Sequence, residues 1–377
     1  MAIFHLVTTL LWLFVLLRFL LPLSLGPIAT VILGLILLLA SQQHHLIRRF
    51  RGSAFSPELP RPLGMLANAL FGTLLLLSTF QFAVELVNLL NFLLKSDYLV
   101  VPLSLRYLAG VTAVALSILG VVQAVRVPPV KEIEVTLHDL APEFEGYRLV
   151  QLTDLHLSQL FAQRWAEEVV ARTNAQEPDL IVITGDLMDG TLEARKDDIE
   201  PLGSLQAKDG VFVIPGNHEY YYGYEGWMDR YQELGMTRLC NSHTRITRGG
   251  SSFVLAGITD SASERFGLPR PDLKGALAGA PCDVPVILLD HQPKGALGAA
   301  RAGVALQLSG HTHGGMVKGL HWLVARFNNG FVSGFYEVGE MLLYVSNGTA
   351  LWNGFALRIG VPSEITVITL RAGRTLE

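Results

Sequence analysis

The chain has 377 residues, of which 50% are hydrophobic and only 16% are charged, and its mean hydropathy is +0.38. Globular chains carry roughly 25% charged residues, so this composition excludes an ordinary soluble protein of this length. Two cysteines, Cys240 and Cys282, also exclude a dense disulfide framework and fit a reducing compartment.

Charge and apolar content are unevenly distributed along the chain. Residues 1–126 contain eight Lys or Arg and three Asp or Glu, a balance of +5, whereas the remaining residues contain 21 and 30, a balance of −9. Two regions with different solvents are therefore expected. We predict a membrane anchor over residues 1–126 and a second domain over residues 130–377, which is long enough to bury its own core.

Four apolar stretches are predicted to form the anchor, at about residues 2–22, 26–41, 65–84 and 103–124. A bilayer core needs about 20 apolar helical residues, so the second stretch is short, and a re-entrant pair formed by the first two is an alternative. The first stretch lacks the basic flank and small-residue cleavage site of a signal peptide. About four transmembrane helices are expected, as in a multi-pass protein of the inner or cell membrane.

The orientation is predicted from the basic residues between the second and third stretches, which are Arg48, Arg49, Arg51 and Arg61. Cytoplasmic loops are enriched in Lys and Arg, so this connection is expected in the cytoplasm. Four crossings then place the N-terminus and the second domain in the cytoplasm too. Arg18 and Arg106, which are expected near the opposite face, count against this orientation.

The segment over residues 85–102 is apolar but contains charged and amide side chains. It is either an extension of the third helix with an interfacial end or an amphipathic helix in the headgroup region. Glu85 is either an ordinary interfacial residue or a functional intramembrane carboxylate. The anchor as a whole is expected to carry no chemistry of its own.

The second domain alternates short apolar runs with helical stretches. A helix is predicted over residues 163–176, with Trp165, Val169 and Val170 on its apolar face. Strands are predicted over residues 132–137, 148–153, 179–186, 210–217, 252–260, 284–291, 304–311, 341–348 and 364–370. Consecutive apolar residues are typical of strands buried on both faces, so this pattern predicts a layered α/β sandwich.

Side chains that can bind metal follow five of these strands at their carboxyl ends, where ligands bind in α/β sheets. They are Asp154 and His156; Asp186 and Asp189; Asn217 and His218; His291; and His311 and His313. Each motif alone is weak, but five in order at strand ends indicate one site. Imidazole mixed with carboxylate and amide ligands suits Mn²⁺, Fe or Zn²⁺ better than Ca²⁺ or Mg²⁺.

The ordered pattern DxH, GDxxD, GNHE, H and GHxH resembles the signature of the calcineurin-like metallophosphoesterase superfamily. The sequence that flanks these motifs is similar to the bacterial membrane-associated branch of that superfamily. The resemblance covers about residues 130–372 and not the anchor. It implies a four-layer α/β/β/α sandwich, attached here to N-terminal transmembrane helices. It also implies a metal-dependent phosphoric ester hydrolase with two divalent ions, manganese before iron or zinc.

The resemblance further implies a role for each matched residue. Asp154, His156 and His313 would hold the first metal, Asn217, His291 and His311 the second, and Asp186 would bridge them. His218 would face the scissile phosphate as a hydrogen-bond donor or general acid, and Asp189 would orient it. Tyr220, Tyr221, Tyr222 and Tyr224 either line the substrate mouth or pack in a loop, and His321 and Trp322 either touch lipid or substrate or are structural.

The expected activity is hydrolysis of phosphoester or pyrophosphate bonds in a lipid-linked substrate. A phospholipid or a UDP-diacylglucosamine-like lipid would fit, since some hydrolases of the latter resemble this branch. A phosphodiesterase or phosphatase for soluble substrates, with the helices only as anchor, is the alternative. A sensor with a degenerate site and a transporter are disfavoured by the complete ligand set and the few intramembrane charges. The acidic second domain gives no sign of a nucleic-acid partner, and the oligomeric state stays open.

Overall fold

The computed structural model describes residues 2–50 and 56–373, so Arg51 of the predicted cytoplasmic loop lies outside the described residues. The chain divides into two compact units. The helical unit comprises the residues up to Ala124 together with Asn353–Ile359, and the sheet unit comprises Val125–Trp352 and the residues from Gly360 onward. The predicted domain boundaries, which remain predictions, did not include the return of Asn353–Ile359 to the helical unit.

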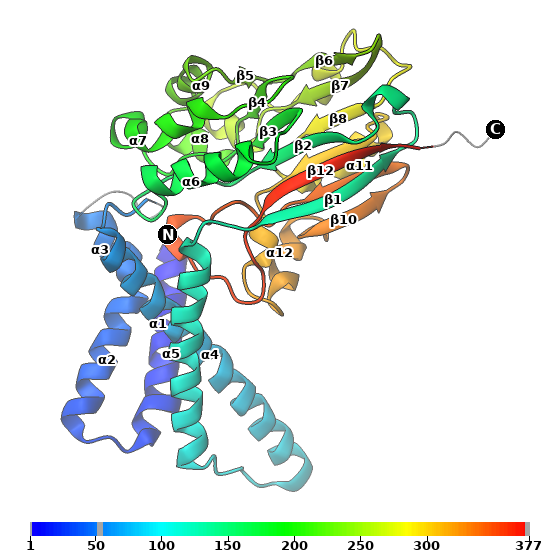
Figure 1. Cartoon of the computed structure of the whole chain (residues 1–377). Coiled ribbons are helices and arrows are strands. Elements are labelled where there is room, and N and C mark those ends of the chain that lie inside the picture. Colours follow the sequence, from blue (N-terminus) through cyan, green and yellow to red (C-terminus); the bar gives the residue numbers. More distant parts are fainter. Residues whose placement is uncertain (1, 51–55, 374–377) are drawn as a thin grey trace. The chain divides into compact units, whose positions relative to one another are not determined.

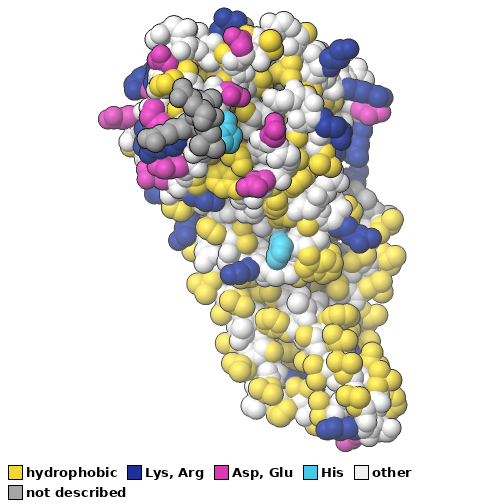
Figure 2. Space-filling view, turned by 90° about the vertical axis from the view of Figure 1, so that its right-hand side faces the viewer, with side chains coloured by type: hydrophobic (Ala, Val, Ile, Leu, Met, Phe, Trp, Pro, Cys, Tyr) yellow, Lys and Arg dark blue, Asp and Glu magenta, His cyan; other side chains and the backbone are white. Residues whose placement is uncertain are grey.

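The helical unit consists of α1 (Ala2–Val15), α2 (Pro27–Ser41), α3 (Gln43–Phe50), α4 (Arg61–Lys95) and α5 (Leu103–Val125). A π turn at Leu16–Leu20 and a short 3₁₀ turn continue α1. Three of the described helices are long and apolar enough to cross a membrane, over Ile3–Leu23, Arg61–Lys95 and Leu103–Val125. The stretch at Pro27–Ser41 is shorter, as the sequence indicated. Hydrophobic side chains cover most of this unit's visible surface (Figure 2), which fits a lipid solvent.

The third predicted helix extends well beyond its apolar core, because α4 continues without a break to Lys95. Glu85 on α4 accepts hydrogen bonds from Arg18 Nε at 2.9 Å and Arg18 Nη2 at 2.7 Å. Gln81 Nε2 donates to the same carboxylate at 2.6 Å. Glu85 is therefore an ion-paired residue, and the pairing reduces the cost of placing both charges in an apolar unit.

The chain returns to the helical unit at Asn353–Ile359. The Ala356 N–H donates to Asn68 Oδ1 at 2.8 Å, and the Arg358 N–H donates to the Gly120 carbonyl at 3.0 Å. His44 Nε2 lies 2.6 Å from the Gly354 carbonyl. Side chains and carbonyls of the helices thus bind the backbone of a segment that contains no regular strand or long helix.

The sheet unit contains two six-stranded sheets of mixed direction, and strands of both sheets are labelled in Figure 1. The first sheet has the order β1 (Val130–Leu137), β12 (Ile365–Ala372), β2 (Tyr147–Leu152), β3 (Leu180–Thr184), β4 (Val211–Ile214) and β5 (Thr237–Arg238). The second has the order β10 (Gly334–Val338), β11 (Met341–Val345), β9 (Leu306–Ser309), β8 (Val286–Leu289), β7 (Ser251–Gly257) and β6 (Ser242–Arg248). Strands β2 to β5 are parallel to one another, as are β7, β8, β9 and β11.

Alternation along the strands creates the layers. Phe253 and Leu255 of β7 belong to the core between the two sheets, whereas Val254 and Ala256 belong to a second core with α10 (Leu273–Ala276) and α11 (Ala296–Arg301). Successive side chains of a strand point to opposite faces, so both faces of this sheet are buried. The remaining helices are α6 (Gln163–Asn174), α7 (Leu192–Ile199), α8 (Asn217–Tyr221), α9 (Tyr224–Glu233) and α12 (His321–Phe327). The predicted α/β sandwich is confirmed.

Every predicted strand is present, but three strands were missed: β5, β6 and β10. All three lie at sheet edges. The sequence of β6 is SHTRITR, in which only Ile246 is buried, and β5 has two residues. An edge strand buries little, so its sequence lacks the continuous apolar run by which the central strands were recognised.

Phe253 provides a test of the inter-sheet core. Its ring is fully buried and lies 5.0 Å from Phe144 and 5.6 Å from Tyr147, measured between ring centroids. Replacing Phe253 by Ala should reduce the free energy of unfolding by about 3–5 kcal/mol, because the cavity adds to the lost burial. Thermal unfolding of the full chain in detergent measures this. Leu297→Ala, at an exposed position, should change it by less than about 0.5 kcal/mol; equal effects would contradict the assigned core.

Candidate dinuclear metal site

The site is built on loops that leave the carboxyl ends of β2, β3, β4, β8 and β9. The Asp154 N–H donates to the Gly185 carbonyl at 3.0 Å, and the His156 N–H donates to the Asp186 carbonyl at 3.0 Å, so the loops after β2 and β3 are held side by side. Positive φ angles occur at five of the predicted ligands, which are Asp154, His156, Asp186, His311 and His313. Non-glycine residues rarely adopt this region, and such strain gathers at functional sites.

The first group of potential ligands consists of Asp154, His156 and His313, whose ligand atoms all lie within 4.8 Å of one another. Asp154 Oδ1 is 3.9 Å from His156 Nε2 and 3.8 Å from His313 Nε2. Both carboxylate oxygens of Asp154 accept the His311 N–H at 3.1 Å. The distances of 3.9 and 3.8 Å from Asp154 Oδ1 to the two imidazole nitrogens exceed hydrogen-bond distance and fit ligand atoms that share a cation.

The second group consists of Asp186, His291 and His311, again within 4.8 Å. His291 Nδ1 donates to the Thr184 carbonyl at 2.7 Å, which leaves Nε2 at 3.2 Å from Asp186 Oδ2 and 3.3 Å from Asn217 Oδ1. Asp186 Oδ2 also lies 3.8 Å from His156 Nε2 of the first group. Asp186 is thus placed between the two groups, where a bridging carboxylate would have to lie.

His218 and Asp189 form a third contact beside these groups. Asp189 Oδ1 lies 2.5 Å from His218 Nδ1 and 3.0 Å from His156 Nδ1. A single carboxylate therefore fixes the ring orientation of both histidines, and each Nε2 faces away from it. His218 Nε2 is 4.0 Å from Asp186 Oδ2.

The residues present fit a pair of metal ions. Among the described residues, His156 Nε2 is buried without a hydrogen-bond partner, although its Nδ1 is held by Asp189. A buried imidazole nitrogen that faces two carboxylates and lacks a proton partner is suited to a cation. Gly216 also permits close approach, since a Cβ at this position would lie 2.2 Å from Asp186 Oδ1.

The electrostatics of the site favour positive charge. Burial opposes ionisation of Asp186, but the charges of His291 and His218 outweigh it and hold the pKa of Asp186 well below its usual value. Burial likewise lowers the pKa of His218, yet Asp186 and Asp189 raise it to about 9. Both carboxylates therefore favour the protonated ring, which can donate a hydrogen bond from Nε2.

Glu219, the last residue of the GNHE motif, holds two loops of the site together. Its Oε2 accepts the N–H groups of Asp186 at 3.1 Å and Gly216 at 2.7 Å. Its Oε1 accepts the Leu187 N–H at 2.8 Å and the Tyr231 hydroxyl at 2.9 Å. Glu219 thereby joins the loops after β3 and β4, which carry Asp186 and Asn217. Its place in GNHE, directly after the potential donor His218, was the available sequence signal.

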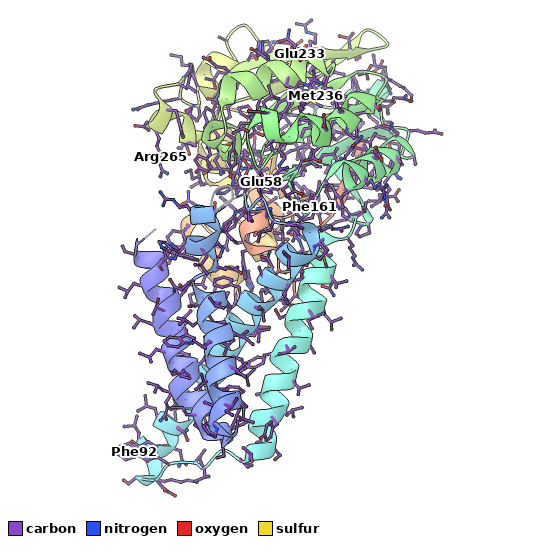
Figure 3. All side chains as sticks on the ribbon, turned by 90° about the vertical axis from the view of Figure 1, so that its left-hand side faces the viewer. Glu58, Phe92, Phe161, Glu233, Met236 and Arg265 are labelled. Atoms are coloured by element: carbon purple, nitrogen blue, oxygen red, sulfur yellow. The ribbon has the colours of Figure 1, made fainter. Side chains whose placement is uncertain are left out.

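Aromatic side chains surround His218. The ring of Tyr221 is 5.4 Å and that of Tyr222 is 6.1 Å from the His218 ring, and Tyr221 is 40% exposed. Phe266 lies 6.2 Å from Tyr221 and is 49% exposed. Arg265, the preceding residue, lies at the periphery of the sheet unit (Figure 3). Of the predicted tyrosine cluster, Tyr220 is instead buried and stacks on Tyr224.

Comparison with known proteins places this geometry in a family context. Residues 147–315 match the calcineurin-like phosphoesterase family. A transmembrane protein with metallophosphoesterase domain from Danio rerio is 34% identical over 327 residues, which are 83% of this chain and 74% of that protein. An uncharacterized metallophosphoesterase of Campylobacter jejuni is 34% identical over 276 residues, 71% of each chain. The solved 5'-nucleotidase precursor of Thermus thermophilus is 15% identical with a TM-score of 0.36, over 59% of this chain and about half, 54%, of that one.

The contacts of Glu219 generate a prediction for metal binding. Glu219→Gln replaces one acceptor oxygen by an NH₂ group that faces backbone N–H donors, so the loops that carry Asp186 and Asn217 should separate. Loss of such a supporting contact typically weakens metal affinity about 10–100-fold. Titration of the metal-stripped full chain with Mn²⁺, followed by calorimetry, measures this. Tyr231→Phe removes one of the four donors and should have a smaller effect; unchanged affinity in Glu219→Gln would contradict the role.

Proposed function

Because this chain belongs to the calcineurin-like metallophosphoesterases and has helices long enough to cross a membrane, we propose that it hydrolyses phosphoester or pyrophosphate bonds of a lipid-linked substrate at a membrane surface. The chain is a metal-dependent phosphoric ester hydrolase and a membrane protein. The single observation that carries the lipid proposal is the joining of a two-group metal site to these helices in one chain.

We assign the two groups to two divalent ions. Asp154, His156 and His313 would hold one ion, Asn217, His291 and His311 the other, and Asp186 would bridge them. Such a pair of ions supplies Lewis acidity and stabilises both the attacking and the leaving oxygen of an in-line displacement. The imidazole-rich set suits Mn²⁺ first, with Fe or Zn²⁺ as alternatives.

His218 is proposed to donate its Nε2 proton toward the scissile phosphate or its leaving oxygen. Asp186 and Asp189 raise its pKa and so favour the protonated ring, and Asp189 Oδ1 at 2.5 Å holds the opposite ring nitrogen. Tyr221 and Tyr222 beside the His218 ring would line the entrance for the group that leaves.

A membrane anchor confines the enzyme to two dimensions and raises its rate of encounter with a lipid substrate, such as a phospholipid or a UDP-diacylglucosamine-like lipid. Soluble esters are the alternative substrates. Nucleic acid is disfavoured, since the chain beyond residue 126 has a charge balance of −9 and polyphosphate backbones require basic surfaces.

The substrate proposal is tested with the purified full chain and Mn²⁺, by comparing lipid-linked pyrophosphates and phospholipids in mixed micelles with soluble diesters. Lipid substrates should be turned over with the higher kcat/KM. Asp186→Ala should lower kcat/KM on either substrate by at least about a hundredfold, since it removes a ligand from both ions, and chelation should abolish turnover. Robust turnover of soluble diesters without any of the lipids would contradict the lipid proposal, whereas full activity of Asp186→Ala would contradict the two-metal site.

The role of His218 is tested by the leaving group. His218→Asn should lower kcat about 10²–10⁴-fold on an ester with an alkoxide leaving group, which needs a proton. The loss should be much smaller with nitrophenolate, a weak base. Exposed His138 offers a matched control, His138→Asn. An equal loss on both esters would assign His218 to substrate binding instead.

We also propose that the sheet unit lies in the cytoplasm, from the basic residues between α2 and α4 and the positive-inside rule. Fusions of a cytoplasm-active fluorescent reporter and of a periplasm-active phosphatase reporter after Glu377 distinguish the two sides. The fluorescent fusion should be the active one. Activity of the phosphatase fusion alone would reverse the orientation.

A further inference from the structure

Helix α12 (His321–Phe327) exposes a large apolar face in the sheet unit. None of its seven residues is buried, and the exposed fractions are 58% for Trp322, 44% for Leu323 and 79% for Phe327. Residues four apart lie on the same side of a helix. Trp322 and Leu323 therefore share one side with Arg326 and Phe327, so the exposed side combines two aromatic rings, a leucine and a guanidinium.

The stretch of sequence that contains α12 carries charge of one sign. The chain contains no Asp or Glu between His291 and Tyr336, although the residues beyond 126 are acidic overall with a balance of −9. The basic residues of this acid-free stretch are Lys294, Arg301, Lys318 and Arg326. Two of them, Lys318 and Arg326, lie on or just before α12. An apolar face with basic flanks is complementary to an anionic lipid surface.

Helix α12 is joined directly to the candidate metal site. His313 belongs to the turn His313–Gly315, and a Cβ on Gly315 would lie 2.8 Å from His321 Cα, the first residue of α12. Lys318 in the connecting loop packs on Gly360, since a Cβ there would lie 3.1 Å from Lys318 Cβ. Gly360 directly follows Ile359, at which the chain leaves the helical unit. The loop before α12 therefore adjoins the residue at which the chain returns from the helical unit, whose helices are long enough to cross a membrane.

We propose that α12 inserts Trp322, Leu323 and Phe327 into the headgroup–acyl boundary of an anionic leaflet, with Lys318 and Arg326 on the lipid phosphates. Tryptophan suits this boundary because its ring is apolar and its N–H can remain hydrated. The turn that carries His313 is then held at the lipid surface. This membrane contact does not depend on which bond the enzyme hydrolyses, so it goes beyond the proposed function.

The insertion is tested by fluorescence of the full chain in nanodiscs made with brominated phosphatidylglycerol, which quenches tryptophans that contact acyl chains. The chain has five tryptophans, so the contribution of Trp322 is obtained by comparing wild type with Trp322→Phe. The difference signal should be quenched by the brominated lipid and protected from aqueous iodide. A Trp322 signal that iodide quenches and brominated lipid does not would overturn the proposal. Protection from both quenchers would also overturn it, since a protein or a second copy would then cover α12.

The basic residues and the function of the contact are tested with matched variants. Lys318→Gln combined with Arg326→Gln should abolish the preference of Trp322 quenching for anionic over zwitterionic lipid.

Phe327→Ser should lower kcat/KM on a nanodisc-embedded substrate by about tenfold, as expected for loss of one buried ring, and leave kcat/KM on a soluble diester unchanged. Leu297→Ser, exposed on α11 of the same acid-free stretch, should change neither. If no lipid substrate is hydrolysed, the quenching still decides the insertion independently.

Discussion

The structure of the site depends on the burial of like charges. Asp154, Asp186, Asp189 and Glu219 are at most 2% exposed and lie in adjoining loops. Several carboxylates cannot remain ionised together in a dry interior unless positive charge or hydrogen-bond donors offset their repulsion. Histidines, backbone N–H groups and, in this family, two divalent ions provide that compensation. The compensation differs between the carboxylates. Glu219 accepts hydrogen bonds from four donors and Asp189 contacts two imidazoles. Asp154 and Asp186 accept backbone N–H groups and also face the imidazoles with which they could share cations.

This division explains why the loops are strained and yet well held. Ligands at positive φ turn their side chains into the same small volume. The conformational free energy that this backbone geometry costs is offset by hydrogen bonds between loops, such as those from the Asp154 N–H to the Gly185 carbonyl and from the His156 N–H to the Asp186 carbonyl. The central parallel strands supply the frame, because their carboxyl ends bring motifs far apart in the sequence to one edge. A change in Glu219 or Tyr231, which are not among the assigned ligands, therefore reaches the ligands through the backbone.

The central strands and the candidate ligands could be predicted from sequence because their signals are local: an apolar run followed at once by a polar residue. Edge strands β5, β6 and β10 bury too little to leave such a signal. The ion pair between Arg18 and Glu85 joins residues that are 67 positions apart. Sequence alone does not show which residues of α4 lie beside the turn after α1, so this pair could not be predicted. The role of Glu219 was hidden for another reason: its partners are backbone N–H groups, which every residue carries. Assignment of the ligands to particular ions stays a prediction.

The return of Asn353–Ile359 to the helical unit has a consequence for how the protein is made and dissected. Asn68, on α4, satisfies the Ala356 N–H, and Leu357 lies against Gly72 and Gly120. Helices α1 to α5 thus acquire this partner only after residues 353–359 have left the ribosome, so the helical unit cannot complete its packing before most strands of the sheet unit have been translated. For the same reason, a fragment that begins after the helices would leave Phe355 and Leu357 without their packing partners. The enzyme has no single cleavage point that separates two intact halves.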